Sequence, residues 1–338
     1  MHHLLIGEGQ IGQEIAHHAA ARGDTLTILR RSTVTTDQKW ARYGDAAPAI
    51  THVAGDVLDR QALRRAAAGA ESILACFHAP YDARIWQTVL PPREQAVLDL
   101  AETLGIPVVF PESMYAFLGG AARLAEGARP TPGDPKGRIR TELMEARRRH
   151  PATTVSVVAS DVVGPTSRGT GTAVATALVI EPLLAGRPVV VLADPDAPHS
   201  LTHLPDLAQA MVYCARTATT LTAEAPGRSV VLHAPTDTAH SMRALAARTA
   251  EHAGVRERRV IAVPRRLTAL LGRVNTLMRE LSGIADLWYG PCVLEPGVLT
   301  TVHGLQATPW AEAIASTIAP PPRAAHGSAA AEPRDARG

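Results

Sequence analysis

The chain has 338 residues, of which 46% are hydrophobic and 20% charged, and its formal net charge is +2. This length can bury a large core, and the nearly balanced charge gives no reason to expect a nucleic acid or a membrane as partner. Three cysteines without paired spacing indicate reduced thiols, and no apolar run reaches membrane-spanning length. Because His2 and His3 run directly into an apolar segment, we expect a cytoplasmic protein without a secretory leader.

The first apolar segment is followed at once by a glycine motif. Residues 3–12 read His-Leu-Leu-Ile-Gly-Glu-Gly-Gln-Ile-Gly, and a helix-like stretch continues to Arg22. G-x-G-x-x-G between a strand and a helix is the context that binds a dinucleotide: the first glycine permits a tight turn, the second the approach of a pyrophosphate, and the third close helix–strand packing. The helix N-terminus offers N–H groups to the phosphates. The predicted cofactor loop consists of Gly7, Gly9, Gln10, Ile11 and Gly12.

The end of the second apolar run predicts which dinucleotide is bound. NAD sites usually place an acidic residue there to hold the ribose 2′-hydroxyl. This chain instead has Arg30, Arg31 and Ser32. A guanidinium group matches a 2′-phosphate, and the serine adds a hydroxyl donor. We therefore predict NADP(H) as the cofactor, with a solvated strand end as the alternative interpretation of the arginines.

Strand-like and helix-like segments alternate through the first half of the chain. This order is typical of an α/β protein, and we predict a Rossmann-type doubly wound parallel sheet with a smaller C-terminal substrate lobe. The expected strands are 3–6, 25–29, 50–53, 72–76, 106–110 and 154–159. The expected divisions are a cofactor-binding domain at 1–165, a substrate lobe interleaved with the last sheet strands at 166–319, and a disordered tail at 320–338.

The second half is more irregular. A charged amphipathic helix is expected at 138–150, where Pro151 ends it. Short strands are predicted near 188–192 and 229–233, and helices near 206–217 and 241–253. Residues 264–289 read as helical and apolar enough to pack over a site as a lid.

Several short motifs, in this order, carry a family resemblance. Residues 55–59 read Gly-Asp-Val-Leu-Asp, residues 78–81 His-Ala-Pro-Tyr, residues 111–115 Pro-Glu-Ser-Met-Tyr, and residues 199–208 His-Ser-Leu-Thr-His-Leu-Pro-Asp-Leu-Ala. With these motifs the chain resembles, over roughly residues 1–319, the extended or atypical short-chain dehydrogenase/reductase superfamily in its NAD-dependent epimerase/dehydratase branch. The resemblance implies that Asp56 and Val57 lie near the adenine, that Asp59 caps the next helix, and that His78 belongs to the cofactor loop after the fourth strand. It also implies a homodimer as one candidate assembly, through helices near 90–104 and 138–150.

The resemblance implies a catalytic centre that this chain has altered. The family keeps a catalytic Ser or Thr where Ser113 stands, and about twenty-five residues later a Tyr-x-x-x-Lys pair, often spelled Pro-Tyr-Gly-x-x-Lys. Residues 135–140 read Pro-Lys-Gly-Arg-Ile-Arg, so Lys136 occupies the place of the tyrosine and Arg140 that of the lysine. An arginine still binds a ribose but cannot exchange protons.

Two residues are therefore candidate proton donors, beside Ser113 as a hydrogen-bond donor to the reacting oxygen. Lys136 would serve if burial or the neighbouring Arg138 and Arg140 favoured its neutral form. Tyr115 is the other candidate, because the end of the fifth strand faces the same cleft. The alternative interpretation of Lys136 is a solvated residue paired with surface carboxylates.

Further polar and aromatic residues have competing interpretations. Tyr81 and His199 are candidate substrate contacts, while His78 is a candidate for cofactor contact or a structural role. His199 and His203 have helical metal-ligand spacing, but without an acidic third ligand we expect no metal. The last set is expected to pack the core or the lobe and consists of Trp288, Tyr289 and Trp310.

These observations predict an NADP(H)-dependent oxidoreductase. Its expected substrate is a small carbonyl or alcohol, such as a sugar or an intermediate of secondary metabolism, held at the carboxyl edge of the sheet. Two alternatives follow from the missing tyrosine–lysine pair. One is a sensor that binds NADP(H) without turnover, and the other is an isomerase, dehydratase or cyclase that uses the same cleft without net redox chemistry.

Overall fold

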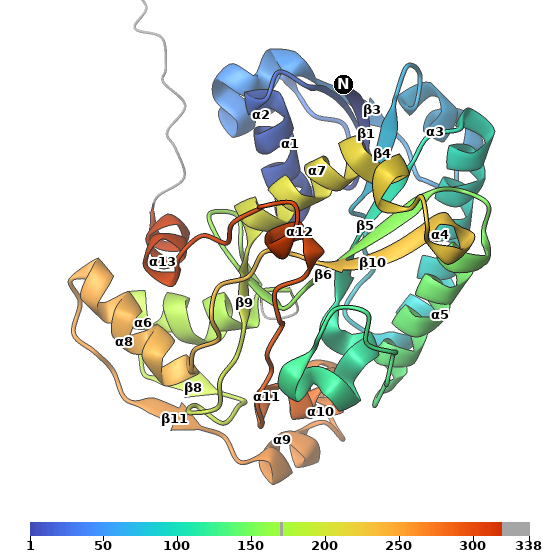
Figure 1. Cartoon of the computed structure of the whole chain (residues 1–338). Coiled ribbons are helices and arrows are strands. Elements are labelled where there is room, and N and C mark those ends of the chain that lie inside the picture. The colour runs from blue at the N-terminus through green and yellow to red at the C-terminus, as the bar shows by residue number, and fades with distance from the viewer. Residues whose placement is uncertain (170–171, 320–338) are drawn as a thin grey trace, which may run out of the picture.

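The computed structural model describes residues 1–169 and 172–319, and its centre is a seven-stranded parallel sheet (Figure 1). The strand order is β10-β6-β5-β4-β1-β2-β3, with all strands parallel. The first strand lies inside the sheet: β2 and β3 are added on one side of it, and β4 to β6 and β10 on the other. This is the order of a doubly wound Rossmann-type fold. The predicted fold class is therefore confirmed.

The sheet strands coincide closely with the predicted apolar runs. They are β1 (His2–Ile6), β2 (Thr25–Arg30), β3 (Ile50–Ala54), β4 (Ser72–Ala75), β5 (Val108–Ser113), β6 (Thr154–Ala159) and β10 (Ser229–His233). The largest difference is at β5, which begins at Val108 and continues through Pro111 to Ser113, beyond the predicted end at 110. Ser113 is therefore the last strand residue, paired with Ala159 of β6.

Alternate residues of each strand support two separate hydrophobic layers. Leu5 packs with α1 (Gln10–Ala21) and α7 (Leu204–Leu221) on one face of the sheet. Leu4 packs with α3 (Arg60–Ala66) and α4 (Ala83–Leu104) on the other face. Both leucines are fully buried, as expected for a central strand of a parallel sheet. Helix α5 (Pro135–Arg149) lies beside α4 and begins three residues earlier than predicted.

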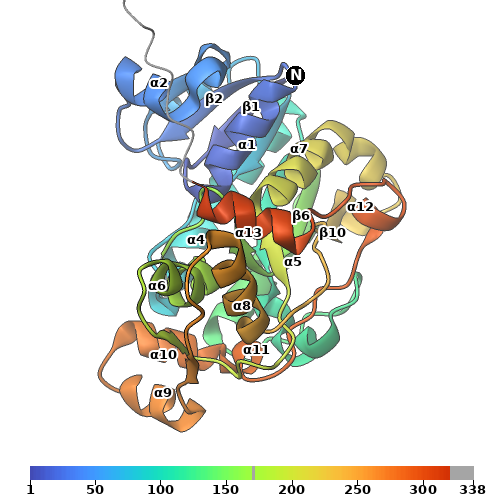
Figure 2. The ribbon, with the colours of Figure 1, turned by 90° about the vertical axis from the view of Figure 1, so that its left-hand side faces the viewer.

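Most of the second half of the chain, apart from α7 and β10, forms the smaller lobe, which occupies the lower part of Figure 2. Its two small parallel pairs join β7 (Asp161–Val163) to β9 (Leu201–His203) and β8 (Val189–Val191) to β11 (Val260–Ala262). The strand predicted near 188–192 therefore pairs outside the central sheet. The lobe helices are η3 (Thr176–Ile180), α6 (Glu181–Leu184), α8 (Met242–Ala253), α9 (Arg265–Leu271), α10 (Thr276–Gly283), α11 (Ala285–Trp288) and α13 (Trp310–Ile318).

The segment predicted to be helical at 264–289, as a lid or lobe over a site, contains three short helices. Gly272 follows α9, and Asn275 caps α10 by accepting a hydrogen bond from the N–H of Met278 at 3.0 Å. The remaining elements are α2 (Thr36–Tyr43), η1 (Gly44–Ala49), η2 (Met114–Arg123), η4 (Pro226–Arg228) and α12 (Val298–Thr301).

None of the helices within residues 1–169 and 172–319 combines the length and apolar character needed to cross a lipid bilayer. The predicted tail at 320–338 lies outside the described residues.

Candidate functional site

Three adjoining hollows follow the carboxyl ends of the central strands. The first, which we call the loop pocket, has a volume of about 290 Å³ and lies between the glycine loop and the end of β2. The central pocket, about 390 Å³, lies next to it, and the inner cavity, about 170 Å³, extends toward the lobe. His78 lines all three, so they adjoin one another along one cleft. Ligands of open α/β sheets bind at this edge.

The glycine loop has the geometry that a bound pyrophosphate requires. Gly7 has φ +96°, and a Cβ there would lie 2.8 Å from the backbone of Cys76. A Cβ on Gly12 would lie 2.2 Å from the carbonyl oxygen of Gly7, so only glycine allows α1 to approach β1 this closely. Gly9 has open space where a Cβ would point, and no described side chain caps the N-terminus of α1. The loop therefore fits a dinucleotide, with Gln10 and Ile11 in the first helical turn.

A buried carboxylate in the glycine loop changes the environment of Arg30. The side chain of Glu8 is 2% exposed and is held by Arg30 at 2.5 Å, Arg42 at 2.9 Å and His52 at 3.1 Å. Its other short contact is from the hydroxyl of Tyr43 at 2.5 Å. Burial alone would raise the pKa of Glu8, but hydrogen bonds from His52 and Tyr43 and the charge of Arg42 lower it to about 2. Two guanidinium groups surround one carboxylate, so positive charge remains in excess.

The other predicted residues of the adenosine side lie around the same pocket. Arg30 donates to Ser32 at 2.9 Å, and exposed Arg31 stands beside them. Asp56 lines the pocket and faces Arg93 at 3.6 Å, while Val57 is buried at its floor. Asp59 accepts hydrogen bonds from the N–H groups of Gln61 and Ala62, which confirms its predicted role as a helix cap.

His78 and Arg140 meet where the central pocket joins the inner cavity. The guanidinium of Arg140 donates to Nε2 of His78 at 3.0 Å, and Nδ1 of His78 donates to the carbonyl oxygen of Ala79 at 2.7 Å. Burial and the charge of Arg140 lower the pKa of His78 to about 4, so its ring is neutral at pH 7. Arg140 also lies 5.0 Å from the ring centroid of Trp86 and 3.5 Å from Glu112. It is thus fixed in the cleft as a permanent positive charge.

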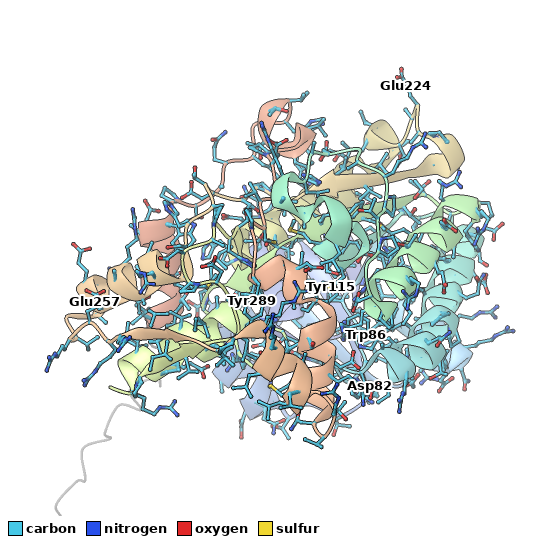
Figure 3. The ribbon with its side chains drawn as sticks, turned by 90° about the horizontal axis from the view of Figure 1, so that it is seen from below. Asp82, Trp86, Tyr115, Glu224, Glu257 and Tyr289 are labelled. Atoms are coloured by element: carbon cyan, nitrogen blue, oxygen red, sulfur yellow. The ribbon has the colours of Figure 1, made fainter. Side chains whose placement is uncertain are left out.

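Two tyrosines from different elements meet on the wall of the inner cavity. The hydroxyl groups of Tyr81 and Tyr115 are 3.0 Å apart. The ring of Tyr115 stacks on that of Trp86 with ring centroids 6.2 Å apart, and Figure 3 labels both residues. Burial raises the pKa of Tyr115 to about 12, although the hydrogen bond with Tyr81 acts to lower it. Ser113 lines the same cavity, and its buried hydroxyl has no hydrogen-bond partner among the described residues. The structure therefore brings Ser113, Tyr115 and Tyr81 together.

Lys136 does not line the inner cavity, although its ammonium lies 5.2 Å from the ring centroid of Tyr81, which does. Its side chain is 1% exposed, and its ammonium contacts the carboxylates of Glu280 at 2.9 Å and Asp134 at 3.1 Å. It also donates to the backbone carbonyl of Glu280 at 2.8 Å. The alternative interpretation of a solvated surface lysine is wrong, because the side chain is buried and joins α5 to the lid helix α10. Among the described residues that line the inner cavity, Lys136 is absent, so the geometry favours a structural role over proton transfer.

The lid is fixed through the same contacts. Glu280 also accepts a hydrogen bond from the N–H of Ala83 at 3.3 Å, and Arg279 pairs with Asp82 at 3.3 Å. Leu287 and Trp288 of α11 then cover the inner cavity. Trp288 therefore lines the site as well as packing the lobe.

The two histidines with metal-like spacing have separate environments. His199 lines the inner cavity and stacks on Trp288 with ring centroids 4.2 Å apart, and burial lowers its pKa to about 4. His203 instead contacts Ser316 at 2.8 Å through Nε2. In residues 1–169 and 172–319 no cluster of three His, Cys, Asp or Glu side chains is arranged to hold a metal ion.

Asp161 is a cavity residue that the sequence reasoning missed. Its carboxylate accepts hydrogen bonds from the N–H groups of Val174 at 3.1 Å and Ala175 at 2.7 Å, and it lines the inner cavity. Burial raises its pKa to about 6 despite these bonds. The available signal was its position: Ser160 and Asp161 are the first polar residues after an apolar strand whose carboxyl end reaches the site.

Comparisons with known proteins support the fold. No family model matches the chain, and no curated protein matches its sequence. Among solved structures, a UDP-glucose 4-epimerase from Thermotoga maritima, solved with UDP-glucose, is 15% identical with a TM-score of 0.68, covering 94% of this chain and 97% of the other. A dTDP-glucose 4,6-dehydratase from Bacillus anthracis, in complex with NAD, is 13% identical with a TM-score of 0.69, covering 94% and 95%.

A third structure agrees with these two. It is a dTDP-glucose 4,6-dehydratase from Streptomyces venezuelae, solved with NAD, which is 17% identical with a TM-score of 0.68, covering 94% of this chain and 95% of the other. Identities this low carry the fold and not the activity. The chain therefore has the same fold as this epimerase and these dehydratases.

Proposed function

We propose that the protein is an NADP(H)-dependent oxidoreductase that acts on a small carbonyl or alcohol. The observation that carries this proposal is the position of Tyr115 and Ser113 on an inner cavity that adjoins the central pocket beside the glycine loop and shares His78 and Arg140 with it. A hydride-transfer site needs these two parts side by side: a place for the dinucleotide and a proton donor at the reacting oxygen.

The proposed chemistry assigns one task to each polar group. Bound in the cleft, the dinucleotide supplies the hydride for reduction of the carbonyl carbon, or accepts it in the reverse direction. Ser113 donates a hydrogen bond to the carbonyl oxygen, and Tyr115 transfers its hydroxyl proton to that oxygen as the C–O π bond breaks. The hydroxyl of Tyr81 donates to the Tyr115 oxygen, and the charge of Arg140 acts to lower the pKa of Tyr115. Both groups stabilise the phenolate that forms.

The preference for the 2′-phosphorylated dinucleotide rests on charge. Arg30 and Arg42 exceed the single charge of Glu8, and Arg31 stands exposed next to them. A 2′-phosphate placed there meets several guanidinium groups, whereas a bare 2′-hydroxyl does not meet a free carboxylate, because Glu8 is already held. The solved structures with NAD support a nicotinamide dinucleotide in general.

One observation favours a second candidate function. Asp161 is buried in the inner cavity with a pKa raised to about 6, which suits a general base near neutral pH. A carboxylate that removes a proton from carbon and returns it to a different atom would catalyse an isomerisation or a dehydration. In that case the cleft holds its dinucleotide without net hydride transfer.

A single-turnover experiment separates the two candidates. NADPH bound to the protein is mixed with a set of small carbonyl compounds, and its near-ultraviolet absorbance and the products are followed together. We expect loss of the NADPH absorbance in proportion to the alcohol formed. Product without a change in absorbance supports the non-redox function, and the absence of any product across the set supports a sensor without turnover.

A further inference from the structure

We infer that the inner cavity takes a compact, uncharged substrate of about the size of one six-membered ring, and that it excludes nucleotide-linked substrates. This inference rests on the proposed function in one respect, namely that the inner cavity is the substrate site. It extends that function by naming the substrate class.

The size of the cavity is the first argument. Its volume is about 170 Å³. Pockets for drug-sized ligands occupy about 300–1,000 Å³, whereas an apolar cavity of about 150 Å³ holds a benzene molecule. One ring with a carbonyl or hydroxyl group therefore fills the space. A nucleoside diphosphate attached to a sugar adds a base, a ribose and two phosphates, all of which would have to lie outside this volume.

The chemical character of the walls is the second argument. Most of the wall area belongs to carbon, and the apolar side chains on the lobe side are Val162, Val174, Leu207, Leu287 and Trp288. Apolar walls favour a substrate with little polar surface, because an unpaired polar group costs free energy when it leaves water. The hydroxyl groups of Ser113 and Tyr115 serve one oxygen of such a substrate.

The charges around the cavity are the third argument. Of its wall residues within the described chain, only Arg140 carries a fixed positive charge, and that charge already faces His78 and Glu112. Asp161 adds a carboxylate on the lobe side, and His199 is neutral at pH 7 because burial lowers its pKa to about 4. A diphosphate would thus meet a carboxylate without a cation to balance its own charge.

The lid contacts keep the cavity small. Lys136 connects α5 to α10 through Glu280, and Arg279 connects α10 to Asp82. Helix α11 follows directly and carries Trp288, which stacks on His199 at 4.2 Å. Enlarging the cavity for a nucleotide requires that this buried ion pair and this stack separate together, which is a large energetic cost.

The experiment measures binding and does not depend on hydride transfer. Ligand-observed NMR saturation transfer is recorded on the NADPH-saturated full chain with cyclohexanone, cyclohexanol and benzaldehyde as ring probes, and with UDP-glucose and UDP as nucleotide probes. Saturating NADPH keeps the nucleotide probes out of the glycine loop. The same spectra without NADPH show whether ring binding needs the dinucleotide, so failure of the cofactor proposal is distinguishable from failure of the cavity proposal.

Two variants fill the cavity and one is a matched control. Val174→Phe and Ser160→Phe each add a ring inside it, while Val190→Phe makes the first of these substitutions at an exposed position of β8. Thermal melting and NADPH affinity verify that each variant folds, and either filling variant suffices if the other does not.

The ring probes are expected to bind the wild type and Val190→Phe, and at least about tenfold more weakly in the filling variants. The nucleotide probes are expected not to bind at millimolar concentration. Either of two results would overturn the inference. One is UDP-glucose binding that a filling variant weakens; the other is that the ring probes do not bind, or bind equally well to the wild type and to the filling variants.

Discussion

Replacement of Tyr115 by phenylalanine is expected to reduce turnover by about 10²–10⁴, the usual contribution of a positioned proton donor. The substitution removes one hydroxyl and keeps the ring stacked on Trp86. NADPH affinity is expected to stay unchanged, because the ring is on the wall of the inner cavity and not beside the glycine loop. The measurement is kcat/KM with a carbonyl that oxidises NADPH in the single-turnover experiment.

Two further tyrosines serve as comparisons for this prediction. Tyr81→Phe removes only the hydrogen bond to the Tyr115 oxygen, so a smaller loss is expected. Tyr213→Phe is the matched control. Tyr213 lies on α7 and does not line the cavity, and its hydroxyl contacts Nδ1 of His303 at 3.0 Å. Full turnover in Tyr115→Phe would show that another group donates the proton.

Replacement of Lys136 by methionine is expected to lower the free energy of unfolding by about 3–5 kcal/mol, because it removes the cation that buried Asp134 and Glu280 share and leaves Glu280 only Arg279, at 3.4 Å. Methionine matches the length of the lysine stem, so the loss reports the charge rather than a cavity. Urea denaturation monitored by circular dichroism gives the value. The double variant with Glu280→Gln is expected to recover part of the loss, since it removes one of the two stranded charges.

The other lysine of the chain supplies the control. Lys39 donates to the carbonyl oxygen of Ile50 at 2.6 Å near the surface, and Lys39→Met is expected to cost about 1 kcal/mol or less. The folded Lys136→Met protein is expected to keep its turnover, apart from any loss caused by weaker contact between the lid helix α10 and the rest of the protein. A protein with wild-type stability and no turnover would instead identify Lys136 as the proton donor.

The sheet and the glycine loop were predictable because their signals are local. A strand such as β1 is a run of adjacent apolar residues, and the steric reasons for Gly7 and Gly12 depend on a turn of a few residues. The place of Tyr115 near the cleft followed from the rule that strand ends meet at one edge, whereas the places of Ser113 and Arg140 were implied by the family resemblance.

The ion pairs were not predictable, because their partners are distant in the sequence. Lys136 and Glu280 are separated by 144 positions, and no pattern near either residue indicates the other. Glu8 stands inside the glycine motif, yet its effect on Arg30 depends on Arg42 and His52, which the fold of β2 and β3 brings beside it. The pKa of a buried group depends in the same way on neighbours that only the folded chain supplies.

The most direct test of the account is a pair of fluorescence titrations of the protein with NADPH and with NADH, repeated on Arg31→Ala. NADPH is expected to bind tightly and NADH weakly. Removal of the exposed guanidinium is expected to lower the affinity for NADPH about tenfold and to leave the affinity for NADH unchanged. Equal affinity for both dinucleotides would contradict the role of the arginines. Binding of neither would contradict the central claim that this cleft holds a nicotinamide dinucleotide.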